Sequence, residues 1–365
     1  MYISKHIQER LLKMSHSRKF KIVAALLALA VALSVFAACG KKDDIEPQTT
    51  SAGEETTQPA PAGDINPLTG LSGLSESAQG KRPVAVVVEN SPEARPQWGL
   101  CTPDVVIEGL AEGGITRMLW LYSDISNVGK IGPTRSARHN FVEMAAGFDA
   151  IYVHFGGSFV AYNLFSSDSS INHIDGNKGE SGYFQRDKSR KAPHNAYTTG
   201  AQLTQAIADK KFRTDIDASY ATPFSFASEK RTLANPCSSI QIKFSDSYKH
   251  TFTYNSGDGL YYNNMNSKPM VDSDGNQMAV SNVIIIYSNV TMYKNDAKLV
   301  EWNLSEGKGL YVSNGTYEEI TWKKGSTHNQ LKLYSADGSE LKMNTGKTYM
   351  GFVPTSNSSA TLINA

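Results

Sequence analysis

The sequence predicts an α+β protein with a mixed α/β N-terminal domain followed by a smaller, mostly antiparallel β domain. Buried-type apolar runs and helical spacing alternate before residue 231, whereas short β-rich runs separated by Asp-Gly and Asn-Gly turns follow it. All eleven arginines lie at or before Arg231. The 365 residues, 40% of them hydrophobic, suffice for two cores. The balance of 36 basic and 35 acidic residues argues against a nucleic-acid-binding protein.

Residues 1–38 are predicted to be a secretory signal peptide. Basic residues, including Arg18, precede an uncharged run that ends in Phe36-Ala37-Ala38, directly before Cys39. This order resembles the signal of bacterial lipoproteins, in which Cys39 would carry acyl chains such as palmitate and become the mature N-terminus. A plain membrane anchor stays open, because about 17 apolar residues reach the lower edge of spanning length. A buried core helix and a start at Met14 are further alternatives.

Residues 39–66 are predicted to be a flexible tether. They are rich in Thr, Glu, Pro, Ala and Gly and contain almost nothing apolar. Such a segment cannot bury enough surface to offset the entropy of ordering. A flexible segment of n residues spans roughly 5–6 Å × √n, which gives a few tens of Å here. This reach suits a globular body held off the extracytoplasmic face of a bacterial cell membrane.

Residues 67–231 are predicted to form the first domain. Apolar runs there predict buried strands, and an apolar stripe at 3.6-residue spacing predicts helices. Thr198 is the expected N-cap of the last helix. We expect strands at 84–89, 115–122 and 150–155, and helices at 136–146, after 158 and at 200–211.

Residues 232–365 are predicted to form the second, β-rich domain. Its β-rich runs occupy 240–244, 252–254, 283–287, 309–312 and 331–334. Turn sequences between them predict antiparallel hairpins. Asp272-Ser273-Asp274-Gly275-Asn276 resembles the start of a calcium loop, but Gln277 and Val283 stand where glycine and glutamate are required. A hairpin turn is therefore the preferred interpretation.

Two cysteines remain once Cys39 is set aside as the lipidation site. Cys101 and Cys237 lie far apart in the sequence and match neither a zinc motif nor a Cys-x-x-Cys motif. Their pairing requires Cα atoms within about 7 Å, which the sequence does not reveal. Unlinked, buried thiols are the favoured interpretation.

The candidate functional residues lie in the segment from Glu108 to Asn195. This segment contains four of the eight histidines. Arginines beside a glycine turn and a helix N-terminus favour a phosphate or carboxylate ligand. The predicted ligand-binding residues are Arg117, Arg135, Arg138, His154, Gly156, Gly157, Ser158, Asp175, Arg186, Asp187 and His194.

Structural roles compete with this hypothesis. The glycines could form ordinary turns, with Ser158 as a helix N-cap, and Arg135 and Arg138 could belong to a solvated helix face near Glu143. The histidines could simply hydrogen-bond within the fold.

Two chemical alternatives also stay open for the histidines and aspartates. A zinc-like site of His154, His173, Asp175 and His194 lacks a metal-binding motif, so we expect no metal and no cofactor. A general base, His154 or His194, would be oriented by an aspartate. No nucleophile accompanies it, and catalytic residues remain unassigned.

A series of ordered motifs occupies 82–86 (Arg-Pro-Val-Ala-Val), Asn90, 95–97 (Arg-Pro-Gln), 112–117, 131–138, His154 with 156–158, 174–176, 186–187 and 190–195. These motifs resemble the YerB-like lipoprotein family, known as domain of unknown function 3048. They span about residues 81–197, and the β-rich part is similar to the family's C-terminal domain. The resemblance implies a two-domain bacterial envelope lipoprotein and implies no activity.

The leading functional hypothesis is a lipid-anchored lipoprotein that binds an anionic cell-envelope ligand, such as a cell-wall polymer or its precursor. A hydrolase or transferase acting on a cell-wall polymer is one alternative. A scaffold whose β domain docks a cell-wall synthesis enzyme is another. The expected partners are therefore the membrane, an anionic polymer and a cell-wall enzyme, with no nucleic acid.

Overall fold

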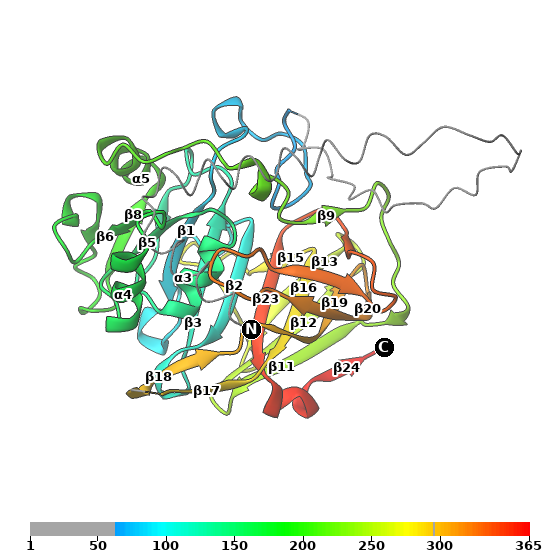
Figure 1. Ribbon diagram of the computed structural model, residues 1–365. Helices are drawn as coiled ribbons and strands as arrows, with labels where there is room; N and C mark the ends of the chain where they lie inside the picture. The colour runs from blue at the N-terminus through cyan, green and yellow to red at the C-terminus, as the bar shows by residue number, and fades with distance from the viewer. Residues whose placement is uncertain (1–62, 295) are drawn as a thin grey trace, which may run out of the picture. The chain divides into compact units, whose positions relative to one another are not determined.

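The computed structural model describes residues 63–294 and 296–365, which are coloured in Figure 1. The predicted signal peptide 1–38, Cys39 and most of the predicted tether 39–66 lie outside the described residues. All described residues belong to one unit of the chain. Their elements confirm the predicted α+β fold class, with more residues in strands than in helices.

An eleven-stranded mixed sheet forms the centre of the described region (Figure 1). Ten strands follow the spatial order β10-β20-β19-β16-β23-β2-β3-β1-β5-β6, and β21 pairs with β20. Their bounds are β1 (Val84–Glu89), β2 (Val105–Leu110), β3 (Thr116–Tyr122), β5 (Ile151–His154), β6 (His173–Asp175), β10 (Asn235–Pro236), β16 (Asn282–Ser288), β19 (Glu306–Ser313), β20 (Thr316–Lys323), β21 (Lys332–Ser335) and β23 (Thr348–Pro354).

A second sheet of six strands is antiparallel throughout. Its strands are β11 (Ser239–Ser245), β12 (Tyr248–Asn255), β13 (Leu260–Met265), β14 (Lys268–Pro269), β15 (Ala279–Val280) and β24 (Leu362–Asn364). Three smaller sheets complete the described strands. They pair β17 (Val290–Tyr293) with β18 (Asp296–Trp302), β9 (Ser225–Phe226) with β22 (Lys342–Met343), and β8 (Ala196–Thr199) with both β4 (Lys130–Ile131) and β7 (Gln185–Arg186).

Helices are few in the described residues and lie mainly before residue 231. The α-helices are α3 (His139–Ala146), α4 (Phe159–Ser167) and α5 (Gly200–Asp209). Short 3₁₀ segments are η1 (Glu76–Ala78), η2 (Pro92–Ala94), η3 (Glu112–Gly114), η4 (Ser181–Tyr183), η5 (Ala218–Tyr220) and η6 (Thr355–Ala360). All three helices lie where the sequence predicted them.

The predicted N-cap of α5 was wrong by one residue. Thr199 is the N-cap, and its hydroxyl accepts a hydrogen bond from the Gln202 amide at 3.2 Å. Thr198 is buried in β8 and donates its hydroxyl to the Tyr183 carbonyl at 2.8 Å. Adjacent threonines are equivalent as cap formers, so only the strand that precedes the helix decides between them.

The central strands are buried on both faces, as the continuous apolar run 84–89 predicted. Ala85 and Val87 of β1 pack in one apolar cluster with Phe141 of α3. Val86 packs in the opposite cluster with Phe252 of β12. The main sheet therefore has α3 and α4 on one face and the second sheet together with α5 on the other.

One strand from the C-terminal region is built into the middle of the main sheet. β23 lies between β16 and β2 and runs parallel to both, with Thr348 opposite Asn282 on one side and Val105 on the other. The regions 67–231 and 232–365 thus share one sheet, and the domain boundary between them stays a prediction. Cys101 and Cys237 are both free thiols.

A buried carboxylate links these layers. Glu108 of β2 has no exposed side-chain surface and accepts hydrogen bonds from His250 Nε2 of β12 at 3.2 Å and from the Tyr349 hydroxyl of β23 at 2.9 Å. Thr116 and Asn90 donate to it at 2.5 and 3.0 Å. Burial alone raises the pKa of Glu108, but the charge of His250 and the hydrogen bonds outweigh burial and hold the pKa below its ordinary value.

We predict that Glu108→Gln lowers the free energy of unfolding at pH 7 by about 3–5 kcal/mol, as for removal of one partner of a buried ion pair. Urea denaturation followed by circular dichroism measures this loss. The depressed pKa stabilises the fold above the ordinary glutamate pKa, and this contribution is lost as pH falls toward the folded-state pKa. The difference between wild type and variant should therefore shrink below about pH 4.5.

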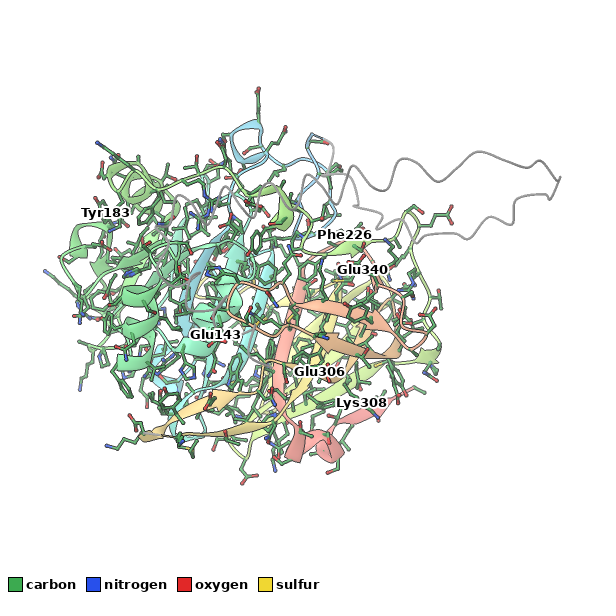
Figure 2. All side chains as sticks on the ribbon, viewed as in Figure 1. Glu143, Tyr183, Phe226, Glu306, Lys308 and Glu340 are labelled. Atoms are coloured by element: carbon green, nitrogen blue, oxygen red, sulfur yellow. The ribbon has the colours of Figure 1, made fainter. Side chains whose placement is uncertain are left out.

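Glu306→Gln is the matched control, because Glu306 is an exposed glutamate on β19 (Figure 2). Its expected effect is within about 0.5 kcal/mol. Equal losses in the two variants would contradict the role assigned to Glu108.

Candidate functional site

Polar residues end three parallel strands of the main sheet. β1 runs parallel to β5, and β5 runs parallel to β6. Their last residues are Glu89, His154 and Asp175, and His154 lies opposite Asp175 in the register. The carboxyl ends of parallel strands meet at one edge of a sheet, which is where α/β proteins commonly bind ligands.

The loop before α3 brings two arginines to this edge. The Arg135 amide donates to the Val87 carbonyl of β1 at 3.0 Å, and the Arg135 carbonyl accepts from the Phe155 amide at 3.0 Å. The Ala137 amide then donates to the Gly156 carbonyl at 2.8 Å. These backbone hydrogen bonds hold the loop between β1 and the turn after β5.

Three arginines converge there with two glutamates, and we call Arg117, Arg135, Arg138, Glu89 and Glu112 the arginine cluster. Arg138 contacts both carboxylate oxygens of Glu112, with Nη2 3.0 Å from Oε2. Arg117 lies 3.7 Å from the same carboxylate and donates to the Ser136 carbonyl at 2.8 Å. Arg135 Nε lies 3.3 Å from Glu89 Oε1. Three guanidinium groups thus face two carboxylates, an excess of one positive charge.

The electrostatics of Arg117 reflect this excess. Burial first, and then the charge of Arg138, lowers the pKa of Arg117 to about 9. Burial alone raises the pKa of Glu112, but Arg138 and Arg117 outweigh it and hold that pKa below its ordinary value. A buried cation that is incompletely compensated favours an added anion.

His194 joins the arginine cluster through Glu89. His194 Nδ1 lies 2.9 Å from Glu89 Oε1, and the Ser91 hydroxyl donates to the same oxygen at 3.0 Å. Within the described residues, Glu89 Oε2 and Arg135 Nε are buried and have no hydrogen-bond partner. Both atoms thus lack a hydrogen bond, although Arg135 Nε lies within the ion pair with Glu89.

His154 and Asp175 belong to a neighbouring group, which we call the histidine pair: His154 and His173 with Asp175. The Nε2 atom of His154 lies 3.0 Å from Nδ1 of His173, and its Nδ1 atom lies 2.7 Å from the Gly156 carbonyl. Asp175 Oδ1 is 3.9 Å from His154 and accepts the Gly156 amide at 2.8 Å. The Tyr162 hydroxyl donates to its other oxygen at 2.7 Å.

Burial dominates the chemistry of the histidine pair. It lowers the pKa of His154 to about 4 and also lowers that of His173. A neutral His154 that faces a carbonyl through Nδ1 must carry its proton there, which leaves Nε2 to accept from His173. His154 has no exposed side-chain surface, so it cannot touch a ligand directly in this conformation.

Most backbone donors of the glycine turn, residues 156–158, form hydrogen bonds within the protein. The Gly156 amide donates to Asp175, and the Ser158 amide donates to the Ala137 carbonyl at 3.1 Å. The Ser158 hydroxyl is the N-cap of α4 and accepts from the Ala161 amide at 3.2 Å. Gly156 has a φ of +77°, which explains a glycine at this position. Gly157 completes the turn beside the ring of Tyr162.

Arg186 and Asp187 lie in a third group, at the end of β7 and in the turn after it. Arg186 donates to the Asn195 side chain at 2.8 Å and lies over the Phe155 ring at 4.7 Å. Asp187 accepts from Lys130 at 2.5 Å. The structure therefore brings Arg117, Arg135, Arg138 and His194 together. It places the other predicted residues in the histidine pair, in the glycine turn 156–158 and in this third group.

Sequence reasoning missed the carboxylates that organise the arginines. Glu112 begins the motif 112–117 and Glu89 ends the predicted strand 84–89, but neither is among the predicted ligand-binding residues. A carboxylate that ends a buried parallel strand is a signal that points to a ligand edge. No local sequence pattern indicated a role for Tyr162, the hydrogen-bond partner of Asp175.

Other features of the described residues lie apart from these groups. No cluster of three or more His, Cys, Asp or Glu side chains with metal-binding geometry occurs in residues 63–294 and 296–365. A polar cavity of about 800 Å³ is lined by residues that include Phe226 and Glu340, both labelled in Figure 2. None of the predicted ligand-binding residues lines this cavity.

We predict that His154 stays neutral, with its proton on Nδ1, between pH 5.5 and 8, because burial holds its pKa near 4. Nitrogen-15 NMR of the imidazole rings measures both the charge and the tautomer. Titration of His154 above pH 5.5, or a proton on Nε2, would contradict the assignment.

The same depressed pKa has a consequence for stability. An unfolded His154 binds a proton near its ordinary pKa of 6.5, but the folded form does not until about pH 4. The free energy of unfolding therefore falls as pH drops through this interval. His154→Gln should lose less stability than wild type between pH 7 and 4.5, as measured by urea denaturation at the two pH values.

Comparison with known proteins places the chain in a family. Models described as the N- and C-terminal domains of "Protein of unknown function (DUF3048)" match residues 68–213 and 240–350. The chain is 32% identical over 292 residues to "Putative lipoprotein YerB" of Bacillus subtilis (strain 168), covering 79% of this chain and 86% of the relative.

The fold agrees with that of a solved relative. The crystal structure of YerB protein from Bacillus subtilis superposes with a TM-score of 0.72 at 30% identity and covers 82% of this chain and 99% of that chain. In the part of the chain that the structure describes, no helix is long and apolar enough to cross a bilayer. Both matched domains and the relative of similar length lead to one conclusion: the chain belongs to the YerB-like lipoprotein family of DUF3048 proteins.

Proposed function

We propose that this protein is a membrane-anchored, extracytoplasmic lipoprotein that binds an anionic cell-envelope ligand at the arginine cluster. The observation that carries the proposal is the convergence of Arg117, Arg135 and Arg138 on only two carboxylates at the carboxyl edge of β1 and β5. An anion that binds there would offset the excess positive charge and would share the guanidinium donors with Glu89 and Glu112.

The anchor part of the proposal rests on the relative's description as a lipoprotein and on the sequence around Cys39. In this proposal acyl chains on Cys39 hold the protein at the extracytoplasmic face of the bacterial cell membrane. Residues 39–66 would then set the distance between the membrane and the arginine cluster.

The donors present favour phosphate or carboxylate groups. A guanidinium offers paired N–H groups that match the spacing of two anion oxygens. The side chains of Arg135 and Arg138 are 27% and 17% exposed, enough for contact with a ligand at the surface. His194, 23% exposed, contacts the same Glu89 oxygen as Arg135 and would extend the contact. A phosphate-bearing cell-wall polymer or its precursor has these groups in repeated order.

A second candidate function is a hydrolase or transferase that acts on the same kind of polymer. The histidine pair favours it, because a hydrogen bond of 3.0 Å between two imidazoles can pass a proton. His173 is half-buried and is the member of the pair closer to solvent. Among the hydrogen bonds of the described residues, none joins His173 to a nucleophilic side chain.

The test is binding of the purified protein to isolated cell-wall material, measured by co-sedimentation. We predict that Arg135→Ala with Arg138→Ala weakens binding at least about 100-fold, because each charge-assisted hydrogen bond contributes about 1.5–3 kcal/mol. Removing the phosphate polymer from the wall chemically should weaken wild-type binding if phosphate is the ligand. Retained binding to the stripped wall would assign a carboxylate instead.

Lys243→Ala with Lys332→Ala is the control, since it removes two charges from surface ion pairs outside the arginine cluster. It should bind as wild type does. Arg135→Lys with Arg138→Lys keeps the charge but loses the paired donors, and we expect intermediate binding. Wild-type binding by the double alanine variant would refute the anion site. Cleaved wall fragments in mass spectra would support the enzyme alternative.

A further inference from the structure

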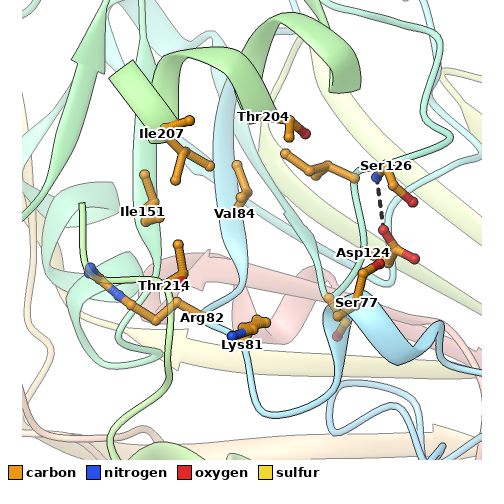
Figure 3. A pocket seen from close by; sticks show the side chains of 14 residues that line it. Ser77, Lys81, Arg82, Val84, Asp124, Ser126, Ile151, Thr204, Ile207 and Thr214 are labelled. Carbon is orange, nitrogen blue, oxygen red and sulfur yellow. Dashed lines mark hydrogen bonds between the residues drawn. The ribbon is translucent and has the colours of Figure 1, made fainter. Parts of the chain in front are cut away.

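A separate cavity lies at the opposite, amino-terminal end of β1 and β5. Its volume is about 310 Å³, and its lining includes Val84 and Ile151, the first residues of those strands. Figure 3 shows α5 on one side, through Thr204 and Ile207, and the segment that carries Asp124 on another. None of the residues of the arginine cluster lines it.

The walls of this cavity are mainly hydrocarbon. Val84, Ile151 and Ile207 line it (Figure 3). Ile125 is a further apolar residue of the lining. The volume falls at the lower end of the range of small-molecule sites, which are largely apolar with a few polar groups that set orientation. A compact hydrocarbon group therefore fits, whereas a long polymer does not.

Three charged residues line the cavity, and two are already paired. Lys81 lies 2.5 Å from Asp215, outside the cavity lining. Arg82 lies 3.2 Å from Asp149 and donates to the Asp149 carbonyl at 2.7 Å. Arg82 shares the Asp149 carboxylate with Arg213, which lies 2.6 Å from it, so both cationic side chains of the lining already have an anionic partner.

Asp124 is the third charged residue of the lining, and it differs from the other two in its partners. Its carboxylate accepts from the Ser75 hydroxyl at 2.6 Å and from the Ser126 amide at 2.8 Å, the contact dashed in Figure 3. In residues 63–294 and 296–365, no cationic side chain forms an ion pair with it. Burial acts to raise the pKa of Asp124, but these hydrogen bonds outweigh burial and hold the pKa below its ordinary value. The carboxylate is therefore ionised at neutral pH.

We propose that this cavity binds a small primary amine that carries a compact hydrocarbon group. The ammonium group lies against the Asp124 carboxylate, and the hydrocarbon lies between Val84, Ile151 and Ile207. An ammonium ion compensates the unpaired carboxylate, and the apolar group leaves water for an apolar wall. The hydroxyls of Ser77 and Thr204 stand in the lining as further acceptors for N–H groups.

This inference does not depend on the anion site. The cavity and the arginine cluster lie at opposite ends of the same strands, and the ligands carry opposite charge. An amine site could thus be present whether or not the protein binds a cell-wall polymer.

Three probes of nearly equal shape test the proposal: 3-methylbutylamine, 3-methylbutan-1-ol and 3-methylbutanoate. Binding of each to the protein is measured by NMR at millimolar concentrations. The amine should bind at least tenfold more tightly than the alcohol, and the carboxylate should bind more weakly than both, because Asp124 repels it. Equal affinity for amine and alcohol, or no binding of the amine, would overturn the proposal.

Two variants locate the binding. Asp124→Asn keeps the shape of the side chain and should remove the preference for the amine over the alcohol. Thr204→Trp fills the cavity from an exposed position of α5 and should abolish binding of both. Thr204 is exposed, so this variant also tests the site if Asp124→Asn proves unstable.

Asp337→Asn is the matched control. Asp337 also accepts from a serine hydroxyl and a backbone amide, at 2.6 and 2.9 Å, but lies outside this cavity. It should bind the amine as wild type does. An equal loss in Asp337→Asn and Asp124→Asn would mean general charge attraction and would refute the site.

Discussion

The buried carboxylate of Glu108 accepts hydrogen bonds from four segments of the chain, and the packing of the two large sheets depends on it. An ionised group without exposed surface is costly unless each oxygen has donors. Those donors must come from β12 in the second sheet and from β23 in the main sheet, as well as from the neighbours of β2. The two sheets therefore pack in the arrangement that brings these donors to the Glu108 carboxylate.

The same network reaches the arginine cluster. Asn90 donates to Glu108 and accepts from the Gln97 side chain, which also donates to the Glu89 carbonyl. Because Asn90 follows Glu89, the core network sets where the Glu89 carboxylate projects at the end of β1. Arg135 and His194 then gather around that carboxylate. A rigid core thus positions the charged groups at the edge of the sheet.

The two ends of β1 and β5 have opposite character for a structural reason. At the carboxyl ends, the loop before α3 and the turn after β5 hydrogen-bond to each other and bring charged side chains together. At the amino ends, α5 packs near the strands through apolar side chains and leaves a cavity beside Asp124. One pair of buried strands therefore separates a cationic surface from a mainly apolar cavity that Asp124 lines.

The sequence alone predicted several elements of the fold and several residues of the candidate site. Local patterns predicted β1 and the three helices and offered the Ser158 cap as an alternative to ligand binding, because strand periodicity and helix caps depend on residues a few positions apart. Ordered motifs indicated the family. The arginines were also identified as candidates, since they crowd into one stretch of the chain. Only the tertiary structure decided that Glu89 and Glu112 pair with them and that β23 lies between β16 and β2. The partners of Glu108 lie up to 241 residues away, and the reason is physical: the cost of burying a charge depends on which distant donors reach it.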